Sequence, residues 1–169
     1  MVKLRSPRTA SIWFILKATP ILCAIFVNDA VAKDLVGKPR VVDGDTIAIA
    51  GIRIRLHGID APEQKQTCQK ANGTPYRCGL MATFALAAII ENHWVTCKGE
   101  KLDRYDRRIA TCYTGPHDVN AEMVDRGWAL AYRRYSRVYV TNETSAKKKK
   151  RGLWQGMFVP PWEWRRGRR

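Results

Sequence analysis

Apolar and polar residues alternate with a period of two from residue 46 to residue 56. The β-forming residues of this stretch flank a turn at Ala50-Gly51, and they are Thr46, Ile47, Ile52, Ile54 and Leu56. The pattern predicts a tight β-hairpin. Such a hairpin can bring Asp45 and Arg55 onto one face. Residues 59–63 should then leave the second strand as a loop held by Pro62.

A helical period replaces this alternation between Gly79 and Glu91, a segment rich in Ala and Leu. Its apolar residues recur at steps of three and four, which predicts a helix that packs on the core and has no chemistry of its own. The residues expected on its core face are Met81, Phe84, Ala85, Ala88 and Ile89.

Two shorter helices are expected nearer the C-terminus. Asp118 is placed to cap a helix over residues 119–126, which Gly127 would end. The apolar residues of this helix are expected in the core, and they are Val119, Met123 and Val124. A further helix should begin at Asn142 or Glu143 and end at Arg151, before Gly152.

Two apolar runs, residues 94–97 and 109–112, have the composition of strands, and the turn between them would make them antiparallel neighbours. Short strands with Gly-rich turns and two or three helices permit an α+β, mainly β, fold. The candidate is a small five-stranded barrel of the oligonucleotide-binding (OB) type. We expect this barrel domain over residues 33–154 and a basic, aromatic tail over 155–169.

The first 32 residues have the pattern of an export signal. A basic beginning is followed by a mostly apolar stretch, residues 12–27, and then by the small-x-small sequence Ala30-Val31-Ala32. Lys17 and Pro20 interrupt the apolar stretch, which disfavours a stable membrane span, although an uncleaved anchor stays an alternative. We therefore expect a secreted or periplasmic protein without a membrane span after cleavage.

Four cysteines follow residue 32, and an even number in an exported chain indicates disulfides. Four cysteines allow three connectivities. Pairing between sequence neighbours is the simplest, and it gives Cys68–Cys78 and Cys97–Cys112. The alternative of a zinc site is disfavoured, because no pair has the Cys-x-x-Cys spacing.

The chain is strongly basic, with 30 Lys and Arg against 15 Asp and Glu. Removing residues 1–32 takes away four basic residues and one acidic residue, leaving 26 against 14 and a net charge of +12. Such a charge favours a polyanionic partner, because Lys and Arg contacts to phosphates release counterions. The alternative is a surface charge that only maintains solubility.

Three motifs carry the candidate chemistry. Asp43-Gly44-Asp45-Thr46 is followed by Arg55-Leu56-His57-Gly58-Ile59-Asp60-Ala61-Pro62-Glu63, and later by Asp103-Arg104-Tyr105-Asp106-Arg107-Arg108. In this order they resemble the staphylococcal nuclease (thermonuclease) family, from about Pro39 to Trp154. The resemblance implies an OB-type barrel and hydrolysis of phosphodiester bonds. Because carboxylates bind hard cations or act as bases, and arginines bind phosphate oxygens, the residue types fit that reaction.

The resemblance also implies roles for single residues. Asp45, Asp60 and the carbonyl of Ala61 would hold Ca²⁺, a cation that takes oxygen ligands in irregular geometry. Taken singly, Asp45 could be a turn residue and Asp60 a cap. Glu63 would orient or deprotonate the attacking water; otherwise it is a surface residue after Pro62.

Two arginines would clamp the phosphate and stabilise its growing charge, namely Arg55 and Arg107. Arg104 and Arg108 are alternatives to Arg107. Family members usually have Gly at the position of Asp106, and Asp tolerates positive φ better than most residues. Its negative charge could weaken the clamp.

Tyr135 aligns with a family position that stacks on a nucleotide, and Arg133 and Arg134 beside it suit a nucleic-acid platform. Half-buried tyrosines at a barrel rim are the alternative. The C-terminal segment has basic runs at 147–151 and 165–169 with aromatic residues between them. Because Pro160-Pro161 would end regular structure, this tail is expected to lie extended on the barrel.

Two functions follow from these observations. The first is a monomeric, calcium-dependent endonuclease that hydrolyses DNA or RNA with little sequence specificity and needs no stable protein partner. The second is a non-catalytic, nuclease-like barrel of the cell envelope that binds a polyanion, as in exopolysaccharide (succinoglycan) biosynthesis. Because Asp45, Arg55, Asp60, Glu63 and Arg107 are all present, we favour the enzyme.

Overall fold

The predicted hairpin is present in the computed structural model, which describes residues 34–168 of the chain. Its strands are β3 (Thr46–Ile49) and β4 (Ile52–Leu56), paired antiparallel with Ile49 opposite Ile52. Both turn residues have positive φ, 48° at Ala50 and 83° at Gly51. This is the two-residue turn whose twist matches that of the flanking strands. The expected export signal, residues 1–32, lies outside the described residues.

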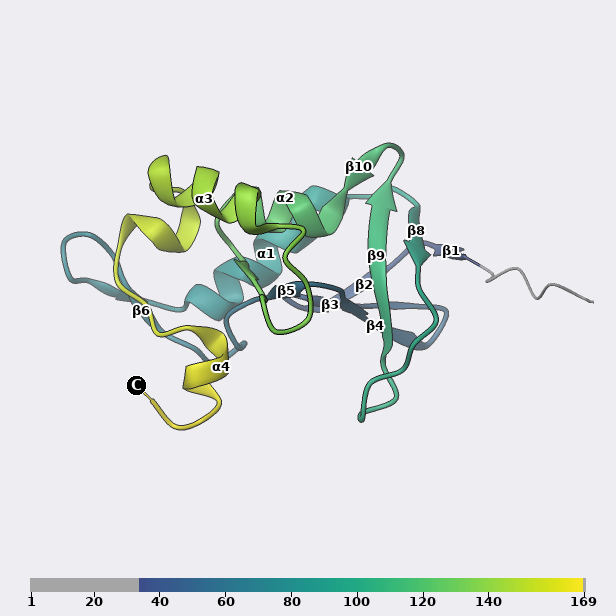
Figure 1. Cartoon of the computed structure of the whole chain (residues 1–169), viewed down its shortest axis with the longest axis horizontal. Coiled ribbons are helices and arrows are strands. Elements are labelled where there is room, and N and C mark those ends of the chain that lie inside the picture. Colours follow the sequence, from purple (N-terminus) through teal and green to yellow (C-terminus); the bar gives the residue numbers. More distant parts are fainter. Residues whose placement is uncertain (1–33, 169) are drawn as a thin grey trace, which may run out of the picture. The chain divides into compact units, whose positions relative to one another are not determined.

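The hairpin belongs to a seven-stranded sheet (Figure 1). Its order is β1-β8-β9-β4-β3-β2, with β10 paired to β9. Only Lys38 and Pro39 separate β1 from β2, so these two strands form one interrupted strand. Its two halves are the first and the last strand of the order. Counting that strand once, five strands make the barrel, which confirms the predicted mainly β, OB-type α+β fold. The remaining strands of the sheet are β1 (Leu35–Gly37), β2 (Arg40–Asp43), β8 (Val95–Lys98), β9 (Arg108–Thr114) and β10 (His117–Asp118).

Two small antiparallel pairs lie outside the main sheet. They join β5 (Ile59–Asp60) to β11 (Leu130–Ala131), and β6 (Cys68–Gln69) to β7 (Pro75–Tyr76). The first pair matters for the site, because it fixes the chain directly after β4.

The helices are α1 (Cys78–Ile90), α2 (Val119–Asp125), α3 (Val140–Lys148) and α4 (Pro161–Trp164), with a 3₁₀ turn, η1, at Gly152–Gln155. In Figure 1, α1, α2 and α3 gather on one side of the strands. Asp118 caps α2 as predicted, because its side chain accepts a hydrogen bond from the backbone NH of Ala121 at 2.9 Å. The third helix begins two to three residues earlier and ends three residues earlier than predicted.

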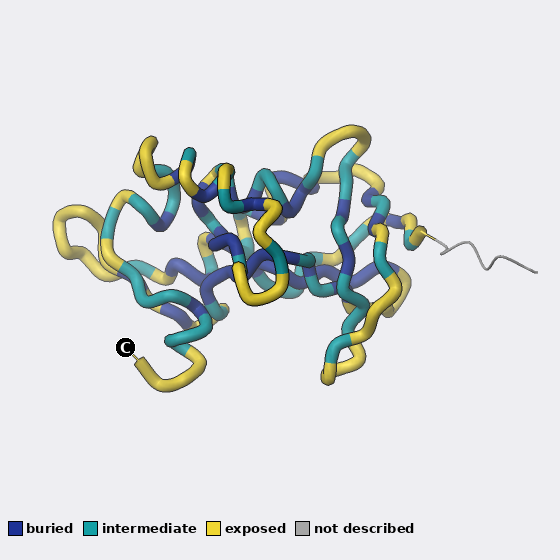
Figure 2. The backbone as a smooth tube through the Cα atoms, in the orientation of Figure 1, coloured by how far each residue is buried: buried dark blue, intermediate teal, exposed yellow. Residues whose placement is uncertain are grey.

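The core lies between the barrel strands and the helices (Figure 2). The predicted core residues of α2 are all fully buried. The predicted core face of α1 is only partly right, because Ile89 is buried and Ala85 packs against the core while the other three residues are exposed. Met81 is 41% exposed and Phe84 56% exposed, and Ala88 is exposed too. The buried residues of α1 include Ala82, Leu86, Ile89 and Ile90. Since apolar residues surround this helix, its period could not identify which face meets the barrel.

The two expected disulfides, Cys68–Cys78 and Cys97–Cys112, are confirmed. Cys97 and Cys112 are directly opposite each other in the β8–β9 pair, as the predicted antiparallel arrangement of these strands requires. Within residues 34–168, no helix combines the length and apolarity needed to cross a membrane.

The prediction of an extended tail is wrong in one respect. Pro161 begins the short helix α4, because the first turn of a helix does not need the NH group that proline lacks. The tail does lie on the barrel domain through its aromatic residues. Trp162 stacks on Tyr132 with ring centroids 5.5 Å apart, and Phe158 packs edge-on against Trp154.

Candidate active site

Asp45 is positioned by the turn that precedes β3. Its backbone NH donates to the Oδ1 of Asp43 at 3.0 Å, and its carboxylate Oδ2 accepts from the NH of Ala61 at 2.9 Å. Gly44 allows this close approach, since a Cβ there would lie 2.8 Å from the Cβ of Ala61 and 2.8 Å from that of Ala82. The Asp-Gly-Asp turn therefore joins the loop after β5 to α1, and it leaves Asp45 only 3% exposed.

Arg55 connects the two buried aspartates. It lies on β4 opposite Thr46, and its guanidinium forms an ion pair with Asp45. Its second terminal nitrogen lies 2.6 Å from the Oδ1 of Asp60. Asp45 and Arg55 do come together as expected, but alternation is not the reason. Thr46 lies opposite Arg55, and Asp45 precedes β3, where the turn directs its carboxylate to the guanidinium. The Arg55 side chain is 17% exposed, so this ion-pair cluster is largely shielded from solvent.

Asp60 is fully buried on β5, where it pairs with Leu130 of β11. The chain then leaves through Pro62 to Glu63, whose NH donates to the Oε1 of Gln66 at 3.2 Å. The Glu63 loop lies directly on the start of α1, because a Cβ at Gly79 would be 1.8 Å from the Glu63 carbonyl oxygen. Gly79 is therefore required for this contact.

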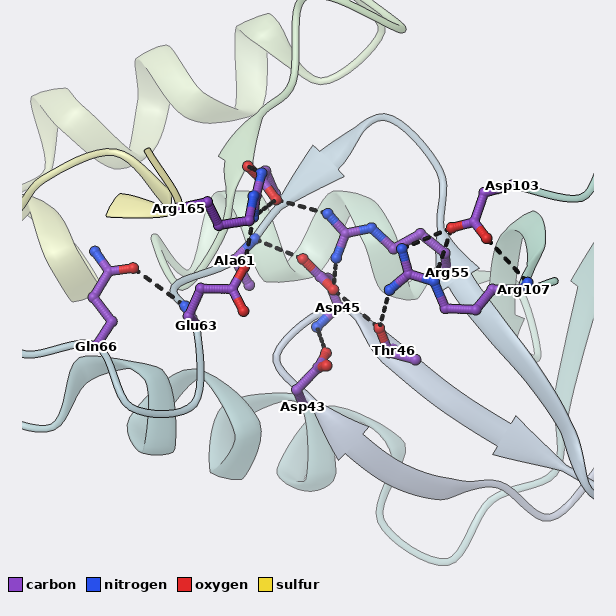
Figure 3. A network of polar contacts seen from close by, with 11 residues as sticks. Asp43, Asp45, Thr46, Arg55, Ala61, Glu63, Gln66, Asp103, Arg107 and Arg165 are labelled. Atoms are coloured by element: carbon purple, nitrogen blue, oxygen red, sulfur yellow. Dashed lines mark hydrogen bonds and ion pairs between the residues drawn. The ribbon is translucent and has the colours of Figure 1, made fainter. Parts of the chain in front are cut away.

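A residue not predicted for the site, Arg165, reaches it from the C-terminal segment. Its NH1 lies 2.6 Å from Oε1 of Glu63 and 3.1 Å from Oδ1 of Asp60, and its NH2 lies 2.7 Å from Oδ2 of Asp60. In Figure 3 it enters opposite Arg107, with Asp45 between them. Desolvation lowers the pKa of Arg165, but hydrogen bonds and charges of Asp60 and Glu63 raise that pKa above its usual value. The basic run 165–169 was the only signal, and it did not single out Arg165.

Arg107 is held by Asp103 in the loop before β9. Its Nε donates to Oδ2 of Asp103 at 2.8 Å, and its NH1 lies 3.4 Å from Oγ1 of Thr46. Desolvation raises the pKa of Asp103, but hydrogen bonds from Arg107 and Tyr105 and the charge of Arg107 lower it below its usual range. Asp106 has a φ of 57°, so Asp does sustain the turn at the position where the resemblance implied Gly. Of the two alternatives to Arg107, Arg108 donates instead to the Gly99 carbonyl.

A cleft of about 690 Å³ adjoins this cluster. Arg55 and Arg165 form part of its wall, together with Arg134 and Tyr135. Tyr135 is 66% exposed, and the Arg134 guanidinium lies 6.0 Å from the centre of its ring. The other residues that line the cleft include Tyr105, Tyr132, Lys101 and Arg104.

Arg133 does not lie with its predicted partners. Its guanidinium is 2.6 Å from the buried carboxylate of Glu143, and both residues line a second pocket. Glu143 also accepts from the NH of Ala131 on β11 at 3.1 Å. Arg133 thereby helps to hold the strand that pairs with Asp60.

The candidate cation ligands are few and consist of oxygen donors. Among the described residues, no three His, Cys, Asp or Glu side chains converge as a metal cluster. Asp45 and Asp60 could supply two carboxylates and Ala61 a carbonyl, with water completing the shell, which suits Ca²⁺ better than zinc. The donor set fits such an ion, and Asp60 already holds a cation, the Arg165 guanidinium.

The family model described as "Staphylococcal nuclease homologue" matches residues 53–156. The chain is 35% identical over 140 residues to the "Succinoglycan biosynthesis protein ExoI" of Rhizobium meliloti (strain 1021), covering 80% of this chain and 73% of the relative. It is 34% identical over 158 residues to an "Uncharacterized endonuclease" of Escherichia coli O157:H7, covering 88% and 97%. It is 32% identical over 145 residues to a "Micrococcal nuclease" of Shigella flexneri, covering 75% and 78%.

This chain therefore belongs to the staphylococcal nuclease homologue family. Membership and the names of these relatives support nuclease activity in general terms. The matched segment ends before Arg165.

Proposed function

We propose that this protein is an exported, calcium-dependent endonuclease that hydrolyses phosphodiester bonds of DNA, RNA or both. The observation that carries the proposal is the buried Asp45–Arg55–Asp60 cluster beside a cleft of arginines and tyrosines. Two buried carboxylates and a guanidinium, next to a basic cleft, suit a phosphate group bound together with a cation.

The proposed reaction assigns one task to each residue. Asp45, Asp60 and the Ala61 carbonyl hold Ca²⁺, which when bound supplies positive charge beside the reacting phosphate. Arg55 and Arg107 donate hydrogen bonds to phosphate oxygens and stabilise the charge that develops on them. Glu63 accepts a proton from the attacking water.

The cleft wall supports binding with little sequence preference. Tyr135 offers an exposed ring and Arg134 a guanidinium beside it. Stacking on an aromatic ring tolerates any base, and a cation binds the backbone phosphate whatever the sequence. We assign nucleic-acid binding to Tyr135 and Arg134, and only a supporting place to Arg133, which is paired with Glu143.

Export to the periplasm or the medium is part of the proposal. The export-signal pattern of residues 1–32 and two disulfides support an oxidising compartment. We expect the mature protein isolated from the producing cell to begin near Lys33.

A non-catalytic role in the cell envelope is the second candidate. It is favoured by the similarity to a relative that is named a succinoglycan biosynthesis protein. That name describes the relative and not this chain. A protein of this kind would bind polyanions without cutting them.

One experiment separates the two. The purified protein should cut single-stranded DNA or RNA with Ca²⁺ and lose this activity in chelator. Glu63→Gln should keep DNA binding and lose cleavage by about 10²-fold or more, the scale of general-base contributions. Glu91→Gln, which makes the same change at an exposed position at the end of α1, is the control. DNA binding without any cleavage by the wild type would favour the envelope role.

A further inference from the structure

Arg165 occupies the carboxylates that the proposed reaction needs. Its guanidinium takes both oxygens of Asp60, and it also contacts Glu63 (Figure 3). A calcium ion bound to Asp60 would need at least one of those oxygens. A Glu63 oxygen that accepts from a guanidinium is also occupied as an acceptor for the proton of water.

Arg55 also contacts Asp60, but the two arginines are held differently. Arg55 is part of β4, which pairs with β3 on one side and β9 on the other, and its side chain is 17% exposed. Arg165 follows the four-residue helix α4, and its side chain is 39% exposed. Arg165 can therefore leave Asp60 without disturbing the barrel, whereas Arg55 cannot.

Hydrogen bonds from Gln66 and Gln69 anchor the tail up to Pro160. The buried Gln66 donates to the Val159 carbonyl at 2.6 Å, and Gln69 exchanges two backbone hydrogen bonds with Met157. Beyond Pro160, Pro161 is buried, and Trp162 packs against a small apolar cluster and stacks on Tyr132 of the cleft wall. Through this stack and the ion pairs of Arg165, α4 is held next to Tyr132 of the cleft wall and next to Asp60, a proposed ligand of the cation.

We propose that Arg165 is an intramolecular competitor of the divalent cation: it neutralises Asp60 in the cation-free chain and leaves when the cation binds, releasing α4 from the cleft. This proposal rests on the proposed function, which assigns the cation to Asp45 and Asp60. In consequence, the protein needs more calcium for activity than its carboxylates alone would require.

Calcium binding measured by calorimetry tests the competition. If the tail occupies Asp60 for all but about a tenth of the time, apparent affinity is reduced about tenfold. Arg165→Ala should therefore bind Ca²⁺ about tenfold more tightly than the wild type. Arg166→Ala, which removes the same charge from the next residue, should bind Ca²⁺ like the wild type. Asp60→Asn, which removes a proposed ligand, measures the calorimetric signal of Ca²⁺ binding elsewhere on the protein.

The outcomes separate this proposal from the proposed function. The wild type and Arg165→Ala could bind Ca²⁺ with equal affinity while Asp60→Asn does not bind it. That result would overturn the competition and leave the cation site in place. Failure of every variant to show Asp60-dependent Ca²⁺ binding would overturn both.

Amide hydrogen exchange provides a second test, which uses the wild type alone and so does not depend on whether a variant folds. Saturating Ca²⁺ should speed exchange in residues 161–168, since Trp164 and Arg165 lose the backbone hydrogen bonds of α4 to Pro160 and Pro161. Exchange there that is unchanged or slower, at a Ca²⁺ concentration that fills the Asp60 site, would refute the release of α4.

Discussion

The free energy of unfolding should depend strongly on Arg55 when no cation is bound. Asp45 and Asp60 are 3% and 0% exposed, and Arg55 forms ion pairs with both. Arg55→Ala leaves two buried carboxylates close together, with Arg165 bound to only one of them. Removing one partner of a buried ion pair costs about 3–5 kcal/mol. For a chain of this size that corresponds to a decrease in Tm of roughly 6–20 °C.

Urea unfolding in chelator, followed by circular dichroism, measures this loss. Arg53→Ala is the matched control, because Arg53 lies on the same strand and is exposed; its effect should stay within about 0.5 kcal/mol. Calcium should restore more stability to Arg55→Ala than to the wild type, since the ion replaces the missing positive charge. At a Ca²⁺ concentration of about 100 Kd, a single site contributes about 2.7 kcal/mol. An Arg55→Ala variant within about 1 kcal/mol of the wild type in chelator would refute this account of the cluster.

Three further predictions concern the walls of the site. Arg107→Ala should lower kcat more than it raises KM in steady-state cleavage assays, because its contacts strengthen in the transition state; a change in KM alone would contradict that role. Tyr135→Ala should raise KM for single-stranded DNA while Tyr135→Phe, which keeps the ring, should not; equal effects of both would argue against stacking. Because the folded-state pKa of Asp103 lies below its unfolded value, its stabilisation is present above the unfolded pKa of about 3.9 and is lost as pH falls through the folded pKa. The unfolding free energies of the wild type and Asp103→Asn should therefore differ at pH 6 and converge in strong acid, and a difference independent of pH would contradict this.

Local signals predicted much of the barrel. The Ala50-Gly51 turn, the Asp118 cap and the strands around Cys97 and Cys112 each depend on residues close together in sequence, and each is confirmed. The predicted approach of Asp45 to Arg55 is also present. It depends on the turn before β3, because strict alternation in this register would place the two residues on opposite faces.

Contacts between distant segments could not be predicted in this way. Arg165 and Asp60 are 105 positions apart, and the run of basic residues around Arg165 offers several equivalent candidates. Arg133 looked like part of a nucleic-acid platform because its sequence neighbours are tyrosines. The buried Glu143, on α3, determines the direction of the Arg133 side chain instead. In both cases an ion pair with a carboxylate that is distant in sequence determines where the arginine side chain lies.

The parallel pairing of β4 with β9 has a consequence for the order in which the protein folds. Ile54 lies opposite Arg108, so Arg55 and Arg107 come together only across this seam, while α1 and β8 separate the two strands along the chain. Contacts between strands so far apart in sequence form more slowly than local ones, because a long loop must first be closed. The hairpin and the helices can form early, but the two arginines meet only when the barrel closes. The proposed phosphate site is therefore assembled late in folding, and a newly made chain carries no complete site until its barrel is finished.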